Sequence, residues 1–201
     1  MSDQDLLRHA GEFSKAMRNN KFEISPEGIF LPAAKIFVRG LYSHRVRNKD
    51  GASPWVDDPN LLPVEGINTM LDNLNAASGS AAYISLYSNG TAPQATWNAA
   101  NYNANAAEIV SGSDGYSEGT RQLWNAAAAA AGSKDNYAAA AVFTIITTGS
   151  PLTVNGVGLH TVSTKGTGTG KLLSSTRFGS SRSFATTDEF DVKYRLTITS
   201  S

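Results

Sequence analysis

The 201-residue sequence contains no cysteine, so it can form neither disulfide bonds nor metal sites built on thiolates. It also has no apolar run close to the roughly 18 residues that a membrane-spanning helix needs. The first 20 residues are mostly polar and contain no continuous apolar stretch of the kind found in secretory signals. We therefore expect a protein of the bacterial cytosol, or of a particle assembled there, that does not enter a membrane.

Charge is also scarce, because only 17% of the residues are Asp, Glu, Lys or Arg, and the 17 basic residues balance the 17 acidic ones. This balance argues against a protein that binds nucleic acid through bulk positive charge. The distribution is uneven, since residues 1–50 hold nine basic and six acidic residues. The beginning of the chain is therefore mildly basic.

Motifs that carry chemistry are missing. The three histidines, His9, His44 and His160, stand apart and lack metal-site spacing, and no Gly-x-Ser-x-Gly sequence occurs. The stretch "KGTGTGKLLSS" departs from a phosphate-binding loop, because Lys165 occupies the place of the first glycine and Leu172 follows Lys171. It predicts the tip of a hairpin instead. We expect no enzyme activity, no cofactor and no metal.

The second half of the sequence has the period of β-strands. From residue 190 to 198, apolar residues alternate with polar ones, as in a half-buried antiparallel strand. Further strand-like runs recur at the spacing typical of sandwiches. The sequence predicts a mainly β protein: an antiparallel β-sandwich or jelly-roll-like domain over residues 63–201, preceded by an arm and strand/loop segment over residues 1–62.

Two helices are expected beside the strands. Ile67, Leu71 and Leu74 recur at helical spacing after Pro63 and predict a helix over residues 64–75. A weaker apolar stripe in residues 1–20 predicts a short amphipathic helix that orders only against another surface. The six alanines at 126–131 are too few to nucleate a helix alone, so we expect an extended segment or loop there.

Residues 21–47 predict two short strands, the second of which continues into the basic sequence "SHRVRNK". Arg39, His44, Arg45, Arg47 and Lys49 form a basic cluster with three possible meanings. It could contact nucleic acid, protect an exposed strand edge from aggregation, or face an acidic protein surface. The sequence alone leaves these three open.

An ordered set of segments resembles a family of tailed-bacteriophage virion structural proteins. The most specific are "ISLYSNGTAPQATWNAANY", "DGYSEGTRQLW" and the alanine-rich "DNYAAAAVFTI". The resemblance runs from about residue 28 almost to the end and includes "GIFLPAAKIFVRGLY" and "DPNLLPVEGINTMLD". It implies a structural component of a phage particle, without catalytic motifs, in the head or in the tail.

Within this class we expect a capsid cement, or decoration, protein that stabilises joints between major capsid subunits. Its partners would be the major capsid protein and copies of itself, as a dimer or trimer on the virion, with no direct contact to nucleic acid. The arm would supply apolar anchors and basic residues that steer it toward acidic capsid surface. The anchors are Phe22, Ile29, Phe30, Ile36 and Phe37, and the basic residues are Arg39, Arg45 and Arg47.

Two alternatives stay open. A tail component, such as an adaptor or baseplate ring, would have the same composition. An exterior carbohydrate-binding module would use Tyr83, Tyr87, Trp97 or Tyr102 as stacking platforms, although core packing of these rings is the simpler interpretation.

Overall fold

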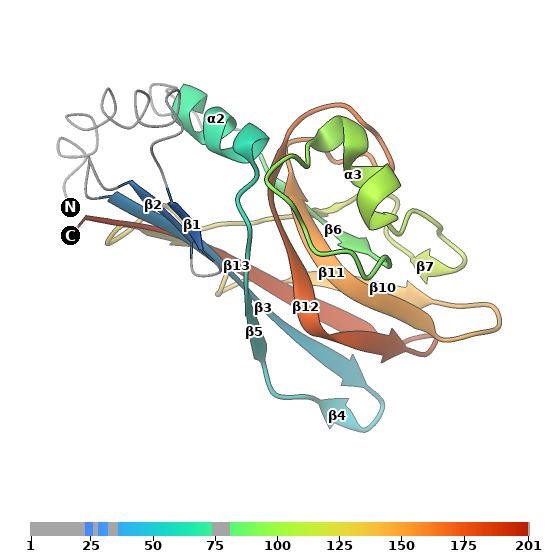
Figure 1. The fold of residues 1–201 in the computed structure, drawn as a ribbon. Helices are drawn as coiled ribbons and strands as arrows, with labels where there is room; N and C mark the ends of the chain where they lie inside the picture. Colours follow the sequence, from blue (N-terminus) through green and yellow to red (C-terminus); the bar gives the residue numbers. More distant parts are fainter. Residues whose placement is uncertain (1–22, 26–27, 32–35, 74–80, 201) are drawn as a thin grey trace.

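A computed structural model describes residues 23–25, 28–31, 36–73 and 81–200 (Figure 1). The amphipathic helix expected within residues 1–20 and the expected anchor Phe22 lie outside these residues. The described chain is mainly antiparallel β, with 46% strand and 12% helix in two sheets and two helices. This confirms the predicted β-sandwich class.

The two sheets are built from strands that are far apart in the sequence. In the larger sheet the order is β1 (Glu23–Ser25), β2 (Gly28–Leu31), β3 (Ile36–Asn48), β13 (Glu189–Ser200), β10 (Ala141–Ile146) and β7 (Gly115–Tyr116). Three short strands join it from the side: β4 (Gly51–Ala52) and β5 (Val56–Pro59) pair with β3, and β9 (Ser133–Asp135) pairs with β13. The smaller sheet has the order β12 (Leu172–Phe184), β11 (Leu152–His160), β6 (Tyr83–Tyr87) and β8 (Gln122–Leu123).

Strands β3 and β13 form a long two-stranded ribbon, which we call the β3–β13 ribbon. It is antiparallel and in register from Glu189 opposite Arg47 to Ser200 opposite Ile36. Short strands cover both of its outer edges, β2, β5 and β4 along β3 and β10 and β9 along β13. In Figure 1 the ribbon extends beyond the smaller sheet toward β1 and β2. This cover protects the long strands from uncontrolled pairing with other chains.

Residues 36–62, which the sequence analysis grouped with the arm, are part of the sandwich. Tyr42 and His44 of β3 are fully buried. On β13 the predicted alternation is observed, because Phe190, Val192 and Tyr194 are at most 1% exposed and face the core. The main core therefore lies between the β3–β13 ribbon and strands β6, β11 and β12.

A second, smaller core lies on the other face of β6. It consists of Tyr87, Trp97, Tyr102, Ala106 and Leu172, and it is covered by helix α3 (Ala99–Ala106). The sequence analysis expected a long irregular connection where α3 forms. Asn98 starts this helix through a capping box with Asn101, in which each side chain accepts a hydrogen bond from the other residue's backbone N–H.

Helix α2 (Val64–Asn73) confirms the helix predicted in this region, with residues 74 and 75 of the prediction lying outside the described residues. It packs on β12 through Gly66. A Cβ atom at Gly66 would lie 2.1 Å from the backbone oxygen of Leu173, so only glycine allows this close approach.

The alanine run is not helical, as expected. Its end turns back into β9 through a two-residue loop, in which Ala130 and Ser133 exchange backbone hydrogen bonds. The two loop residues, Ala131 and Gly132, have positive φ values of 48° and 74°, as in a type I′ hairpin turn. The alanine run thus leads into a tight turn, where the chain reverses its direction beside the β3–β13 ribbon.

Candidate functional site

A serine and a histidine meet in the small sheet with the geometry of a nucleophile and its base. The Oγ atom of Ser85 lies 2.9 Å from Nε2 of His160 and 3.0 Å from the hydroxyl of Tyr102. Both Ser85 and His160 are at most 1% exposed, and Nδ1 of His160 has no hydrogen-bond partner among the described residues. A catalytic pair of this kind needs access for a substrate and a third group that orients the histidine. Burial, followed by the charge of Arg121, keeps the pKa of His160 well below 6.5, so the ring is neutral and structural.

The glycine-rich stretch at 165–170 is held by a buried ion pair. Arg121 donates from Nε and Nη2 to the two carboxylate oxygens of Glu108 at 2.8 and 2.7 Å, and both side chains are fully buried. Glu108 also accepts the backbone N–H of Gly166, while Arg121 donates to the carbonyl of Val162. The stretch connects β11 to β12, which is the hairpin position predicted. Its Gly166 N–H binds a carboxylate of the protein itself, not a phosphate.

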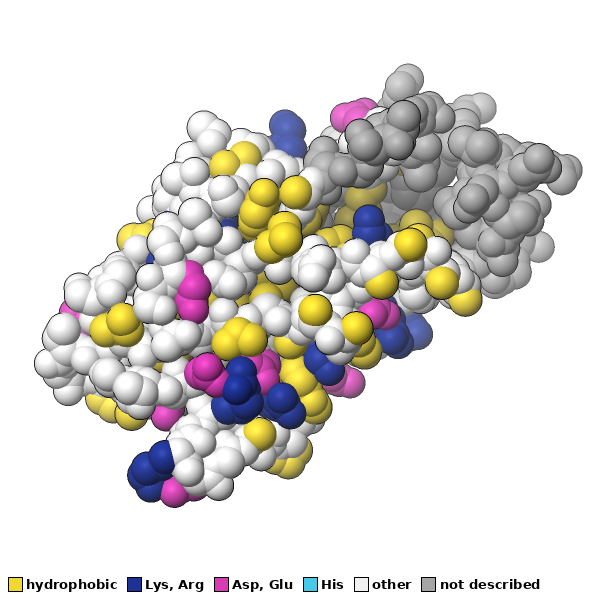
Figure 2. Space-filling model, turned by 180° about the vertical axis from the view of Figure 1, so that it is seen from behind, with side chains coloured by type: hydrophobic (Ala, Val, Ile, Leu, Met, Phe, Trp, Pro, Cys, Tyr) yellow, Lys and Arg dark blue, Asp and Glu magenta, His cyan; other side chains and the backbone are white. Residues whose placement is uncertain are grey.

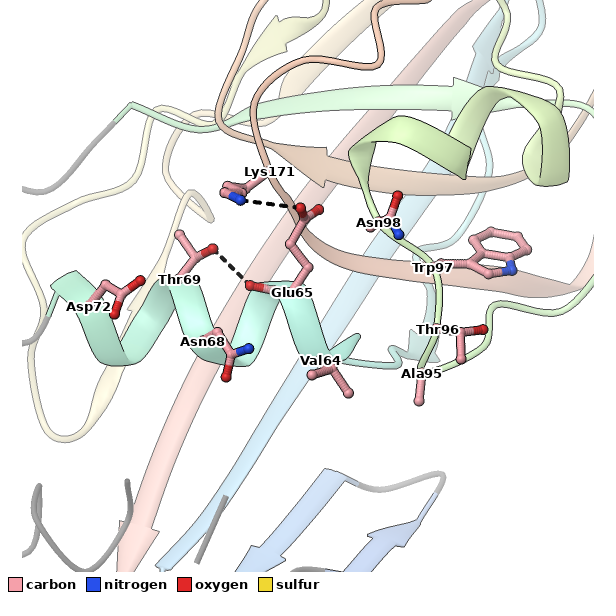
Figure 3. Close-up of a pocket in the computed structure, with 10 residues that line it drawn as sticks. All are labelled: Val64, Glu65, Asn68, Thr69, Asp72, Ala95, Thr96, Trp97, Asn98 and Lys171. Carbon is pink, nitrogen blue, oxygen red and sulfur yellow. Dashed lines mark hydrogen bonds and ion pairs between the residues drawn. The ribbon is translucent and has the colours of Figure 1, made fainter. Parts of the chain in front are cut away.

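A shallow depression of about 580 Å³ lies between α2 and the segment that leads into α3 (Figure 3). Its central carboxylate belongs to Glu65. This group accepts the backbone N–H of Ala99 at 2.7 Å and of Leu172 at 2.8 Å, and it lies 3.5 Å from Nζ of Lys171. Glu65 therefore joins α2, α3 and β12, and its hydrogen-bonding capacity is used by the fold.

The aromatic residues proposed as sugar platforms are mostly in the second core. Tyr87, Trp97 and Tyr102 contact one another edge-on and are at most 3% exposed. A ring that stacks on a sugar must present its face to solvent. The expectation that these three residues stack on sugars is therefore wrong. Of the four rings proposed as platforms, only Tyr83, the first residue of β6, is half-buried.

The outer face of the β3–β13 ribbon carries most of the expected basic cluster. Arg45 and Arg47 both donate to Asp191 at 2.8 Å, and Arg47 also pairs with Glu189. Asp191, one of the polar positions of the predicted alternation, is almost completely buried under these guanidinium groups. Arg45 and Arg47 are thus engaged by carboxylates of the same sheet, whereas Arg39 is exposed. Of the expected apolar anchors, Ile29 and Phe30 lie in β2 and Ile36 and Phe37 in β3, where Phe37 is half-buried.

Beside this ion-pair cluster, three basic side chains stand over two aromatic rings. The Arg45 guanidinium lies 4.6 Å and Lys193 Nζ 4.1 Å from the ring centre of Trp55, while Lys193 lies 5.4 Å and Arg195 4.1 Å from that of Tyr137. We call Arg45, Lys193, Arg195, Trp55 and Tyr137 the cationic row. Figure 2 views this side of the molecule and shows basic and acidic side chains gathered above the β3–β4 hairpin.

The cationic row is the candidate functional site, and the sequence indicated only part of it. The alternation along β13 placed Lys193 and Arg195 on one face. Trp55 and Tyr137 lie in loops whose sequences show no hydrophobic periodicity, so no local pattern predicts their direction. They reach that face because β5 pairs with β3 and β9 pairs with β13. All five residues are half-buried at the surface.

No protein-family model matches this chain, and no curated protein matches its sequence. Among the described residues, no group of three or more His, Asp or Glu side chains could hold a metal ion. Neither helix within that part of the chain is long and apolar enough to cross a membrane.

Proposed function

We propose that this protein is a structural component of a tailed-phage particle, and that it acts as a cement protein on the capsid. The resemblance of its segments to phage virion proteins supports the class. The observation that carries the proposal is the cationic row, because Trp, Tyr and Arg at a half-exposed surface are the residue types that dominate protein–protein interfaces. The chemically capable groups elsewhere, such as Ser85 with His160, are buried in internal contacts.

The β3–β13 ribbon gives such a protein reach. Twelve paired positions, at the usual rise per residue, make a strand about 40 Å long. A rigid element of this length can span a joint between neighbouring subunits, and its covered edges leave the outer face as the contact surface. Many copies on one particle make each modest contact effective through avidity.

The experiment adds purified protein to undecorated heads and, separately, to purified tails, and counts the bound copies. A cement protein binds heads in a number that grows with capsid area, and the decorated heads then resist heating better than undecorated ones. Binding to tails alone, in a small number set by a ring, replaces the cement proposal with the tail-component alternative.

A further inference from the structure

The basic side chains of the outer face differ in how much of their hydrogen-bonding capacity is used. Arg47 donates from both Nε and Nη2 to Asp191 and from Nη1 to Glu189, so each of its three guanidinium nitrogens has a carboxylate partner. Toward the residues that the structure describes, Arg45 and Arg195 each donate only from Nε, Arg45 to Asp191 and Arg195 to Asp135. Lys193 makes no ion pair with any of the described residues. The spare capacity of the cationic row is therefore made of positively charged N–H donors.

These donors are held in place before any partner arrives. Stacking over Trp55 and Tyr137 restrains three long side chains that would otherwise lose rotamer freedom on binding. The hydroxyl of Tyr137 is in turn fixed at 3.2 Å from Oγ of Ser43. A pre-arranged set of charged donors is suited to carboxylates, which guanidinium groups bind with two parallel hydrogen bonds.

We propose that the cationic row binds an acidic segment of a partner protein, whose Asp and Glu carboxylates accept hydrogen bonds from Lys193, Arg195 and the terminal nitrogens of Arg45. The complementarity is local: it comes from the unused N–H donors of the row and not from net charge, because acidic residues of the same face nearly balance the basic ones. The basic residues include Arg39, Arg45, Arg47, Lys193 and Arg195, and the acidic ones include Asp57, Asp135, Glu189 and Asp191.

Asp57 opposes the binding of an acidic segment beside Lys193. It is exposed and lies on β5 opposite Ser43, which in turn lies opposite Lys193, so the three residues share one face. Its negative charge repels an acidic segment on that side of Lys193. Removing this charge should therefore strengthen the binding of the segment.

The test measures binding of a fluorescent oligoglutamate peptide to the full chain at low ionic strength. The double variant Lys193→Gln/Arg195→Gln should lower the affinity at least about tenfold, since it removes two charge-assisted contacts. The control Lys49→Gln/Lys171→Gln removes the same charge from exposed positions outside the row and should bind like the unmodified protein. Asp57→Asn should bind more tightly. Circular dichroism on all variants verifies that the fold is kept.

Three outcomes would overturn the inference. One is the absence of peptide binding to the unmodified protein, and another is an equal loss of affinity in both double variants, which would indicate net charge alone. The third is binding of hyaluronate, a carboxylated glycan, in place of the peptide. The inference rests on the proposed function only for the identity of the partner as a capsid subunit. If the protein binds the peptide but not the heads, the acidic-segment site stands and the cement role is rejected. If the unmodified protein and Lys193→Gln/Arg195→Gln bind heads equally and neither binds the peptide, the cement role stands and the acidic-segment site is rejected.

Discussion

His160 makes the stability of this protein depend on pH. Its pKa in the folded chain is well below the value near 6.5 that the unfolded chain has, because the ring is buried and close to Arg121. Above about pH 6.5 the ring is neutral in both the folded and the unfolded state, and its contribution to the free energy of unfolding is complete. Below that value the unfolded state binds a proton at this residue and the folded state does not. The free energy of unfolding therefore falls by up to about 1.4 kcal/mol for each unit by which the pH is lowered.

The measurement is urea unfolding between about pH 7.5 and 5, with His160→Gln as the comparison. Glutamine keeps a hydrogen-bonding group near Ser85 and cannot take up a proton. The variant should show a smaller loss of stability on acidification than the unmodified protein. Parallel curves would mean that His160 is accessible to protons in the folded state.

The buried pair Glu108–Arg121 should be costly to break from one side. Glu108→Gln leaves the Arg121 guanidinium buried and without a counter-charge, so we expect a loss of about 3–5 kcal/mol in the free energy of unfolding. Replacing both residues, as Glu108→Leu/Arg121→Met, should recover much of it, because no unpaired charge remains. Chemical denaturation of the two variants measures the difference, and a loss below about 1 kcal/mol for Glu108→Gln would contradict a fully buried pair.

Of all features of the fold, the surroundings of individual side chains were the hardest to predict from the sequence. The alternation on β13 gave Phe190, Val192 and Tyr194 their inward direction, since one strand suffices to define its own faces. The same alternation put Asp191 on the polar face but could not reveal that Arg45 and Arg47 cover it, because these side chains come from a partner strand whose register no local pattern contains. The same holds for Trp55 and Tyr137 of the cationic row.

Gly66 reverses the usual preference of a helix for alanine over glycine. In an exposed helix interior, Gly→Ala stabilises by roughly 0.5–1 kcal/mol. At Gly66 the new methyl group would collide with the carbonyl of Leu173, so α2 would have to move off β12. We expect Gly66→Ala to destabilise by more than about 1 kcal/mol.

The matched control is Asn68→Ala, at an exposed position of the same helix, which should be neutral or slightly stabilising. Thermal unfolding of both variants decides the matter. A melting temperature that rises with Gly66→Ala would show that α2 does not approach β12 this closely.

The elements that the sequence revealed are those with a strong period of their own. Strand β13 alternates over most of its length, and α2 has an apolar stripe. Helix α3 has neither, since it consists of Ala, Asn and one Tyr and buries only Ala99, Tyr102 and Ala106. Its existence depends on the cap at Asn98 and on the face of β6 that carries Ser85 and Tyr87, against which Tyr102 packs. The alanine run was correctly excluded as a helix, but its positive-φ turn was not foreseen.

The ribbon decides where the chain can be shortened. If the strands at 29–47 were separate from the sandwich, removing residues 1–45 would leave a soluble domain. Instead, that deletion removes most of β3, including the fully buried Tyr42 and His44. We expect the chain without residues 1–45 to be unfolded or aggregated, and the chain without residues 1–35 to keep the sandwich. Circular dichroism and gel filtration distinguish the two, and a folded product of the longer deletion would show that β3 is dispensable.

The division of the chain into an arm and a sandwich near residue 62 rested on local sequence patterns. Such patterns say nothing of which strands pair. The partner of β3 lies at the far end of the described chain, and neither strand alone indicates the other. The antiparallel class could therefore be predicted, while the order of strands in the sheet could not.

The separation of β3 and β13 along the chain has a consequence for how fast the protein folds. Arg47 meets Glu189 and Ile36 meets Ser200, each across about 140 intervening residues or more, whereas β11 and β12 are joined by the short stretch between His160 and Leu172. Closing a long loop loses more chain entropy before the stabilising contacts form. Folding that depends on contacts between distant parts of the chain is therefore slow. We expect pulse-labelled hydrogen exchange to find the β11–β12 amides protected early and those of the ribbon last. Until that step, the apolar side of β3 has no partner, and the newly made chain is at its most prone to aggregate.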